Sequence, residues 1–128
     1  MTGLFNQFKK LMSKEPTVYS FTQTKSFRGF KKFPMEVNLD PLAKANNLKF
    51  KNVDLTGMLI VFKDVAADRI DVFLNDIYIG YIHEQDRLKD LRNNKISDFH
   101  IKFEEHRVFD AAHEEIRFRG HLLAKYKE

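Results

Sequence analysis

The chain contains a mirrored arrangement of residues that are common metal ligands. Glu104-Glu105-His106 and His113-Glu114-Glu115 stand on either side of Ala111-Ala112. A hairpin turning between them would bring two imidazoles and several carboxylates together, which is a ligand set suited to zinc or a non-haem metal ion. The spacing matches no metal motif, however, and Glu104–Glu115 is equally typical of a polar connection. We therefore expect an ordinary polar segment and no metal site.

Other catalytic patterns are missing from the sequence. The five glycines are not clustered into a phosphate-binding loop, and there is neither a nucleophile elbow nor a His-Glu-x-x-His zinc helix. The chain has no cysteine, which excludes disulfides, thiolate ligands and cysteine nucleophiles. The aspartate pairs Asp68 with Asp71, and Asp86 with Asp90, have spacings typical of solvated faces. We expect a protein that is not an enzyme and needs no cofactor.

Phenylalanines and basic residues alternate in one segment near the N-terminus. Ser26–Phe33 has Phe at every third position from residue 27, with cations between the rings. Proteins hold single-stranded nucleic acid with cations along the phosphates and rings stacked on bases, each stack contributing ~1–3 kcal/mol. The candidate contacts in this segment are Phe27, Arg28, Phe30, Lys31 and Lys32. The alternative is that these phenylalanines pack in the core, because exposed Phe lowers solubility.

A second basic patch is expected on the last strand. Ile116–Tyr126 alternates with period two, which places Arg117 and Arg119 on one face together with two lysines. β-barrels of the oligonucleotide-binding kind use such a strand face for phosphate contacts. The alternative is a solvent-facing strand whose cations are balanced by neighbouring acidic residues.

Basic residues are concentrated in the N-terminal quarter. The net charge is +4, and Met1–Phe33 carries seven Lys or Arg and one acid, which leaves −2 on the rest. Such a segment suits an anionic partner, either nucleic acid or a membrane surface, or only keeps the chain in solution. Within it, Leu4–Lys14 has the apolar stripe of an amphipathic helix. A helix this short needs a surface, which is its own domain, a protein partner or second copy, or lipid.

Period and turn signals predict the remaining elements. Asp40-Pro41 is typical of a helix start, so Pro41–Asn47 is expected to be helical. The strand Ile96–Phe103 should turn its phenylalanines inward, and His100 and Lys102 outward. The other expected strands are Thr17–Thr24, Leu48–Leu55, Gly57–Val65 and Ile116–Tyr126, with a short surface helix within His83–Asn94.

Arg69–Ile82 is the clearest element, a β-hairpin around Asn75-Asp76. Both turn residues tolerate the positive φ that a type I′ turn requires. Gly80 stands mid-strand, where a missing side chain often marks a bend or a close backbone approach. The side chains expected on one face are, in cross-strand pairs, Leu74 with Ile77, Val72 with Ile79 and Ile70 with Tyr81, and those expected on the other are Phe73, Tyr78 and Ile82.

The length of 128 residues favours one domain. We predict an α+β fold, a small and partly closed β-barrel of about six to eight strands with two or three short helices. Residues 1–15 would form the amphipathic helix and residues 16–128 the domain. No run reaches the ~18 apolar residues of a membrane span, and Met1–Glu15 lacks the apolar core of a signal peptide. We therefore expect a cytoplasmic protein.

The block Gly57–Leu91 resembles a HIRAN-type domain. That family has a strand with a polar approach, an alternating strand, a short Asn-led turn, an apolar-Gly-aromatic-apolar strand and a helix with spaced leucines. The corresponding residues here are Met58–Lys63, Ile70–Leu74, Asn75-Asp76, Ile79–Ile82, and Leu88 with Leu91. The resemblance covers 35 of the 128 residues.

The resemblance implies a barrel-like module that binds single-stranded DNA ends, here without the helicase or nuclease domain to which the family is often fused. Two departures concern the ligand pocket. The family's Asp-Pro-Asn-Ala-like approach is replaced by Ala66-Ala67-Asp68-Arg69, which keeps polar character only at Asp68. The family's aromatic pair near the first strand has no assigned counterpart, although Phe27–Phe33 lies in that part of the chain. The fold can carry over without the pocket.

These observations favour a non-enzymatic binding module for single-stranded DNA or RNA. The alternative is a protein-interaction or scaffolding module that docks through its Phe-rich N-terminus. The arrangement of the predicted contacts on the surface distinguishes the two, because a nucleic-acid site needs them in one groove. Those contacts are Phe27, Arg28, Phe30, Lys31, Lys32, Arg117 and Arg119.

Overall fold

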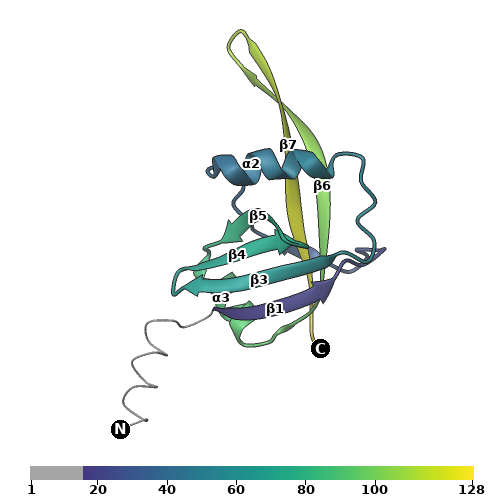
Figure 1. Cartoon of the computed structure of the whole chain (residues 1–128), viewed down its shortest axis with the longest axis vertical. Coiled ribbons are helices and arrows are strands. Elements are labelled where there is room, and N and C mark those ends of the chain that lie inside the picture. Colours follow the sequence, from purple (N-terminus) through teal and green to yellow (C-terminus); the bar gives the residue numbers. More distant parts are fainter. Residues whose placement is uncertain (1–15) are drawn as a thin grey trace.

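The computed structural model describes residues Pro16–Glu128 and shows an α+β fold with two antiparallel sheets. One sheet has the strand order β1-β3-β4-β5 and the other the order β2-β7-β6 (Figure 1). The strands are β1 (Thr17–Thr22), β2 (Lys31–Phe33), β3 (Leu59–Ala66), β4 (Arg69–Leu74), β5 (Ile77–Ile82), β6 (Ile96–Asp110) and β7 (His113–Tyr126). The helices are α2 (Pro41–Asn47) and α3 (Gln85–Arg92), with a 3₁₀ turn η1 (Leu48–Phe50). The helix predicted over Leu4–Lys14 lies outside the described residues.

The hairpin β4–β5 turns at Asn75-Asp76 as predicted, but it is not the expected type I′ turn, because of the two turn residues only Asn75 has a positive φ, of 53°. Leu74 pairs with Ile77, but the register then shifts, because Val72 pairs with Gly80 and leaves Ile79 as the extra residue of a bulge. The predicted pairing of Val72 with Ile79 is therefore wrong, although both side chains are buried as expected. The bulge also reverses the predicted orientation of Ile82, which is fully buried opposite Ile70.

Gly80 marks a close backbone approach, as its position mid-strand predicted. A Cβ added there would lie 2.8 Å from Val37 Cγ1 and 2.9 Å from the carbonyl oxygen of Glu36. The neighbouring Tyr81 exchanges two backbone hydrogen bonds with Glu36, of 2.8 and 3.2 Å. The segment that follows β2 is thus held against the free edge of β5.

Helix α2 begins where Asp40-Pro41 predicted it, because Asp40 Oδ1 accepts hydrogen bonds from the backbone N–H groups of Leu42 and Ala43. The strand predicted over Leu48–Leu55 is wrong. This segment forms η1 and turns, since β3 already has β1 on one edge and β4 on the other. Both edges of β3, the next strand along the chain, are therefore occupied and not open to this segment.

A buried asparagine connects α2 to both sheets. Asn47 is fully buried, and its Nδ2 donates to the carbonyl of Ile79, the bulged residue of β5, at 2.9 Å. Its Oδ1 accepts from the backbone N–H of Gly120 in β7 at 2.7 Å. Asn47 thus satisfies one backbone group in each sheet, and both groups would otherwise be buried without a partner.

The hairpin β6–β7 is longer than predicted. Its ladder runs without interruption from Asp98 paired with Lys125 to Asp110 paired with His113, and the chain turns at Ala111-Ala112. The polar connection expected over Glu104–Glu115 is therefore wrong, because this segment is strand on both sides of the turn. Figure 1 shows the hairpin running past α2 and projecting from the rest of the protein.

The core lies between the two sheets and is rich in phenylalanine. The rings of Phe62 and Phe99 lie 4.5 Å apart between centroids, and those of Phe33 and Phe99 lie 5.3 Å apart. Helix α3 adds Leu88 and Leu91, both buried as their spacing predicted. No strand ladder joins the two sheets within Pro16–Glu128, so a closed barrel is not formed.

Candidate nucleic-acid interface

The three-stranded sheet has one face turned away from the phenylalanine core, which we call the outer face. Directly opposite residues of antiparallel strands share a face, and the register pairs Lys32 with Leu123 and Glu104 with Arg119. The residues of the outer face that matter here are Lys32 from β2, His100, Lys102, Glu104 and His106 from β6, and Arg117, Arg119 and His121 from β7. The fold therefore gathers cations, imidazoles and one carboxylate on a surface that lacks a covering helix in Pro16–Glu128.

Phe27 lies at one end of the outer face, beside His100 and Lys102 of β6. It stands at the start of a turn in which the N–H of Phe30 donates to the carbonyl of Phe27 at 3.0 Å. The Phe27 ring is 5.0 Å from the His100 ring, and Lys102 Nζ lies 5.3 Å from its centroid. The side chain remains 45% exposed. An exposed ring beside a cation is the combination that the sequence predicted for binding a base.

His100 differs from its prediction. It belongs to the outer face, as alternation requires, but it is only 8% exposed because Phe27 and Phe30 lie against it. Its Nδ1 donates to the backbone carbonyl of Thr24 at 3.0 Å, since a carbonyl can only accept. Burial lowers the pKa of His100, and nearby Lys102 lowers it further. His100 therefore supports the Phe27 ring as a neutral imidazole.

Arg119 and Lys32 are the two cations best placed to meet an anion. Neither has a carboxylate within ion-pair distance inside Pro16–Glu128, whereas Lys102 pairs with Glu104 at 2.8 Å and Arg117 pairs with Glu115 at 3.2 Å. The Nε of Arg119 is buried with no hydrogen-bond partner in the described residues.

A cleft runs alongside these two cations. Its walls are Lys32 and the residues that follow it up to Asn38 on one side, and Arg119, Gly120, His121 and Leu122 on the other. It forms because β2 ends at Phe33 and the chain then turns towards β5, where Glu36 pairs with Tyr81. The end of a short strand thus opens the sheet beside the basic side chains.

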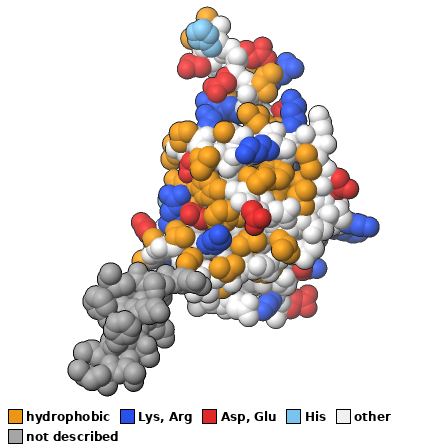
Figure 2. All heavy atoms as spheres, in the orientation of Figure 1, with side chains coloured by type: hydrophobic (Ala, Val, Ile, Leu, Met, Phe, Trp, Pro, Cys, Tyr) orange, Lys and Arg blue, Asp and Glu red, His pale blue; other side chains and the backbone are white. Residues whose placement is uncertain are grey.

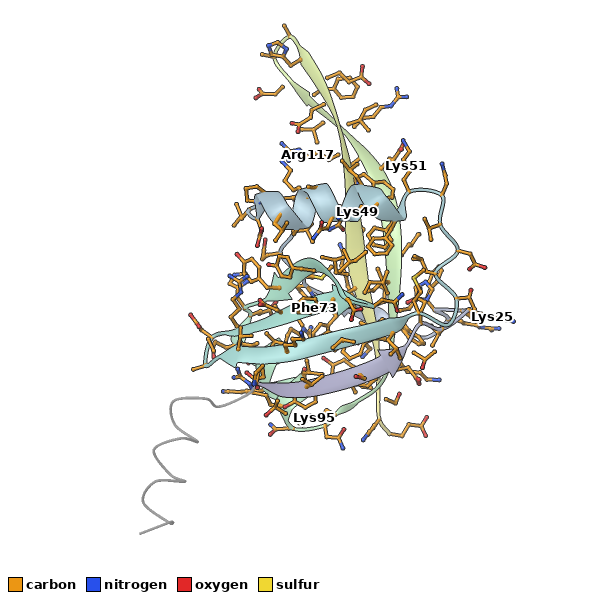
Figure 3. The ribbon with its side chains drawn as sticks, viewed as in Figure 1. Lys25, Lys49, Lys51, Phe73, Lys95 and Arg117 are labelled. Carbon is orange, nitrogen blue, oxygen red and sulfur yellow. The ribbon has the colours of Figure 1, made fainter. Side chains whose placement is uncertain are left out.

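The seven predicted contacts are divided by the fold. Phe27 lies at the outer face, to which Lys32, Arg117 and Arg119 belong. Lys31 pairs with Ala124 and therefore points to the opposite side of the sheet from Lys32. Arg28 is exposed in the turn before β2, and Phe30 is half-buried against His100. Figure 3 shows the labelled Arg117 on the hairpin beyond α2, at a distance from the body of the sheet.

The outer face also contains Lys102, His106 and His121, which are not among the contacts predicted from the sequence. Period two already placed Lys102 on the outward side of its strand, and His121 on the basic side of β7. The pattern does not specify the register between β6 and β7, because the polar residues of Glu104–Glu115 predict a connection and not a continuous ladder.

Two imidazoles and a carboxylate converge on the outer face. His106 Nε2 and His121 Nε2 are 3.0 Å apart, and Glu104 Oε2 is 3.5 Å from each of them. A hydrogen bond from Lys102 lowers the pKa of Glu104, and burial together with nearby Arg119 lowers the pKa of His121. His113, the second histidine of the mirrored arrangement, is not part of this group, since it lies exposed beside the turn at Ala111-Ala112.

Comparison of this chain with protein families, with curated proteins and with solved structures gives no match. Among the helices of Pro16–Glu128, none is long and apolar enough to cross a membrane.

Proposed function

We propose that this protein binds single-stranded nucleic acid on its outer face, without catalysing a reaction. The observation that supports the proposal is the position of Phe27, a half-exposed ring, on the same sheet face as Lys32 and Arg119. A base stacks on Phe27 while Lys32 and Arg119 contact the flanking phosphates. Each phosphate that is neutralised releases counterions, so the affinity must fall as salt rises.

The proposed site includes the cleft between Lys32 and Arg119. The guanidinium of Arg119 supplies one charge for a phosphate, and Lys32 supplies an exposed charge on the other wall. Arg117 extends the basic surface along β7 towards the projecting part of the hairpin. DNA and RNA are equally suited to these contacts, because ring stacking and phosphate pairing do not read the sugar.

The proposal extends to the architecture of the domain, a small and partly closed barrel. Two links support it. Glu36 forms its bridge to Tyr81 at one end, and at the other the Gln23 side chain pairs with the backbone of Ile101 in β6 through bonds of 2.9 Å each. The HIRAN-type relationship stays a prediction. The order β3, β4, β5, α3 over Gly57–Leu91 is compatible with it.

The test is a fluorescence anisotropy titration of a short labelled single-stranded oligonucleotide at several salt concentrations. Lys32→Glu should weaken binding and reduce the slope of log affinity against log salt by about 0.7, the value for one phosphate contact on a single strand. Lys31→Glu is the matched control, because it makes the same charge change on the opposite side of the sheet. Phe27→Ala should weaken binding about 5- to 150-fold at every salt concentration, equivalent to ~1–3 kcal/mol of stacking.

Two outcomes would contradict the proposal. One is that the folded protein does not bind the oligonucleotide even at low salt. The other is an equal loss of affinity in Lys31→Glu and Lys32→Glu, which would indicate general charge attraction and no defined face.

A second candidate function is protein interaction through the projecting hairpin. Phe109 is 74% exposed and Ile116 is 58% exposed, and both belong to the side of the hairpin that faces α2. Figure 2 shows further hydrophobic side chains on the face that includes α2. The helix Leu4–Lys14, on which the protein-interaction hypothesis first rested, lies outside the described residues. If the hairpin docks a second copy, Phe109→Ser with Ile116→Ser should lower the mass measured by light scattering and leave oligonucleotide binding unchanged.

A further inference from the structure

The cluster of Glu104, His106 and His121 has a geometry that hydrogen bonding alone does not require. In the hairpin register His121 lies opposite Lys102 and His106 lies opposite Arg117. The row formed by Glu104 and Arg119 lies between them, and both imidazoles lean towards Glu104, so that the three ligand atoms lie within 4.8 Å of one another.

The distances fit a single metal ion. Zinc bonds His nitrogen and carboxylate oxygen at ~2.0–2.2 Å in tetrahedral geometry, which places two ligand atoms about 3.3 Å apart. The three distances observed here are 3.0, 3.5 and 3.5 Å. One ion therefore sits at bonding distance from all three atoms after shifts of a few tenths of an ångström. Two imidazoles and one carboxylate are also a donor set that divalent transition metals accept.

We propose that Glu104, His106 and His121 bind a divalent transition-metal ion of the zinc class on the outer face. The three protein ligands leave a fourth position open to water or to an anionic oxygen, whereas purely structural zinc sites have four protein ligands. The proposal is independent of nucleic-acid binding, because it rests on these three side chains and not on Phe27 or Lys32.

The neighbours of the cluster orient its ligands. The second oxygen of Glu104 accepts from Lys102 Nζ at 2.8 Å, which leaves Oε2 turned towards the imidazoles. Such outer contacts hold metal ligands in position. Lys102, Arg119 and Lys32 add positive charge nearby, which lowers the affinity for a cation and favours an anion in the open position.

The competing explanation is a hydrogen bond between two neutral imidazoles. This hydrogen bond needs one Nε2 to carry a hydrogen and donate it, and the other Nε2 to be unprotonated and accept the bond. It assigns no role to Glu104 Oε2, which lies 3.5 Å from both nitrogens. The two explanations differ in what happens when a metal is added, because only the first predicts saturable binding that depends on all three side chains.

The experiment is calorimetric titration of the chelator-treated full chain with Zn²⁺ near pH 7.5. We expect one ion per chain and a loss of affinity of about 100-fold or more in His106→Gln, since loss of a ligand should exceed the ~10–100-fold effect of losing an outer contact. Glu104→Gln should also bind more weakly. His113→Gln, which removes a histidine of the same hairpin outside the cluster, should bind like the unchanged protein.

Folding is controlled by circular dichroism of each variant without metal, and Co²⁺ replaces Zn²⁺ to report tetrahedral nitrogen and oxygen coordination by its visible absorption. Equal affinity in His106→Gln and His113→Gln would overturn the proposal, as would the absence of saturable one-to-one binding by the unchanged protein. If His106→Gln is unfolded, the folded Glu104→Gln variant decides by the same comparison with His113→Gln.

Discussion

The two hairpins of this protein turn in the same way but are stabilised differently. In β4–β5 the turn is Asn75-Asp76 and in β6–β7 it is Ala111-Ala112, and the first turn residue has a φ of 53° in one and 51° in the other. Asparagine tolerates this left-handed conformation, whereas for alanine it costs roughly 1–2 kcal/mol. The second hairpin therefore forms against the preference of its own turn, because its long ladder holds the turn in place.

Burial is the second difference between the hairpins. Strand β4 alternates buried and half-buried residues along its whole length, and Val72, Ile70 and Leu74 are fully buried. Near the turn of β6–β7 both faces are exposed or half-buried, so no apolar face specifies the register there. Arg119 and the three candidate metal ligands lie on this second hairpin, where the apolar pattern specifies the register least.

The largest effect should come from placing a charge in the buried hairpin. Val72→Asp buries an unpaired carboxylate and should lower the free energy of unfolding by about 3–5 kcal/mol. Val108→Asp makes the same change in the projecting hairpin and should cost less than about 1 kcal/mol. Urea denaturation measures both. Similar losses in the two variants would show that the hairpins do not differ in burial as described.

A smaller loss should follow from cutting the link between the hairpins. Asn47→Ala leaves the carbonyl of Ile79 and the N–H of Gly120 buried without partners, which should cost about 2–4 kcal/mol. Asn46→Ala is the matched control, because it removes a single hydrogen bond, of 2.8 Å to the carbonyl of Tyr78, and should cost about 1 kcal/mol. Equal losses would argue against a role for Asn47 in joining the two sheets.

The base of the second hairpin should respond to acid through His100. The pKa of His100 is lowered in the folded protein, so the unfolded chain takes up the proton at a higher pH than the folded protein does. The free energy of unfolding should therefore decrease as the pH is lowered below about 6.5. His100→Asn keeps a donor for the Thr24 carbonyl but cannot become charged. The difference in unfolding free energy between pH 8 and pH 5 should therefore be smaller in this variant. An unchanged difference would mean that His100 is protonated as easily in the folded protein.

The smallest effect concerns the turn of the second hairpin. Ala111→Gly removes the penalty of the left-handed conformation and should raise the free energy of unfolding by about 0.5–1 kcal/mol. Ala112→Gly, at the neighbouring turn position, should be neutral or slightly destabilising because glycine only adds freedom to the unfolded chain. Thermal denaturation compares the two variants. Stabilisation by Ala112→Gly alone would show that the strained residue is Ala112 and not Ala111.

The sequence by itself determined the elements whose signals are local. The Asn75-Asp76 turn, the Asp40 cap of α2 and the leucines of α3 depend on residues within a few positions of one another, and each was predicted at its place, although the turn is not of type I′. The burial of Val72 and Ile79 followed from alternation in the same way. Gly80 also carried a local signal, since its missing side chain predicted the close approach of another segment.

The tertiary structure decided how those elements pair. The bulge at Ile79 depends on Asn47 and on the segment around Glu36, and both are distant in sequence. The register of β6 with β7 places Glu104 near His121, which no local pattern specifies. Strand pairing is a property of two segments, and a one-residue shift moves every side chain to the other face. For this reason the sequence indicated which types of residue form the candidate site but not which individual residues lie together in it.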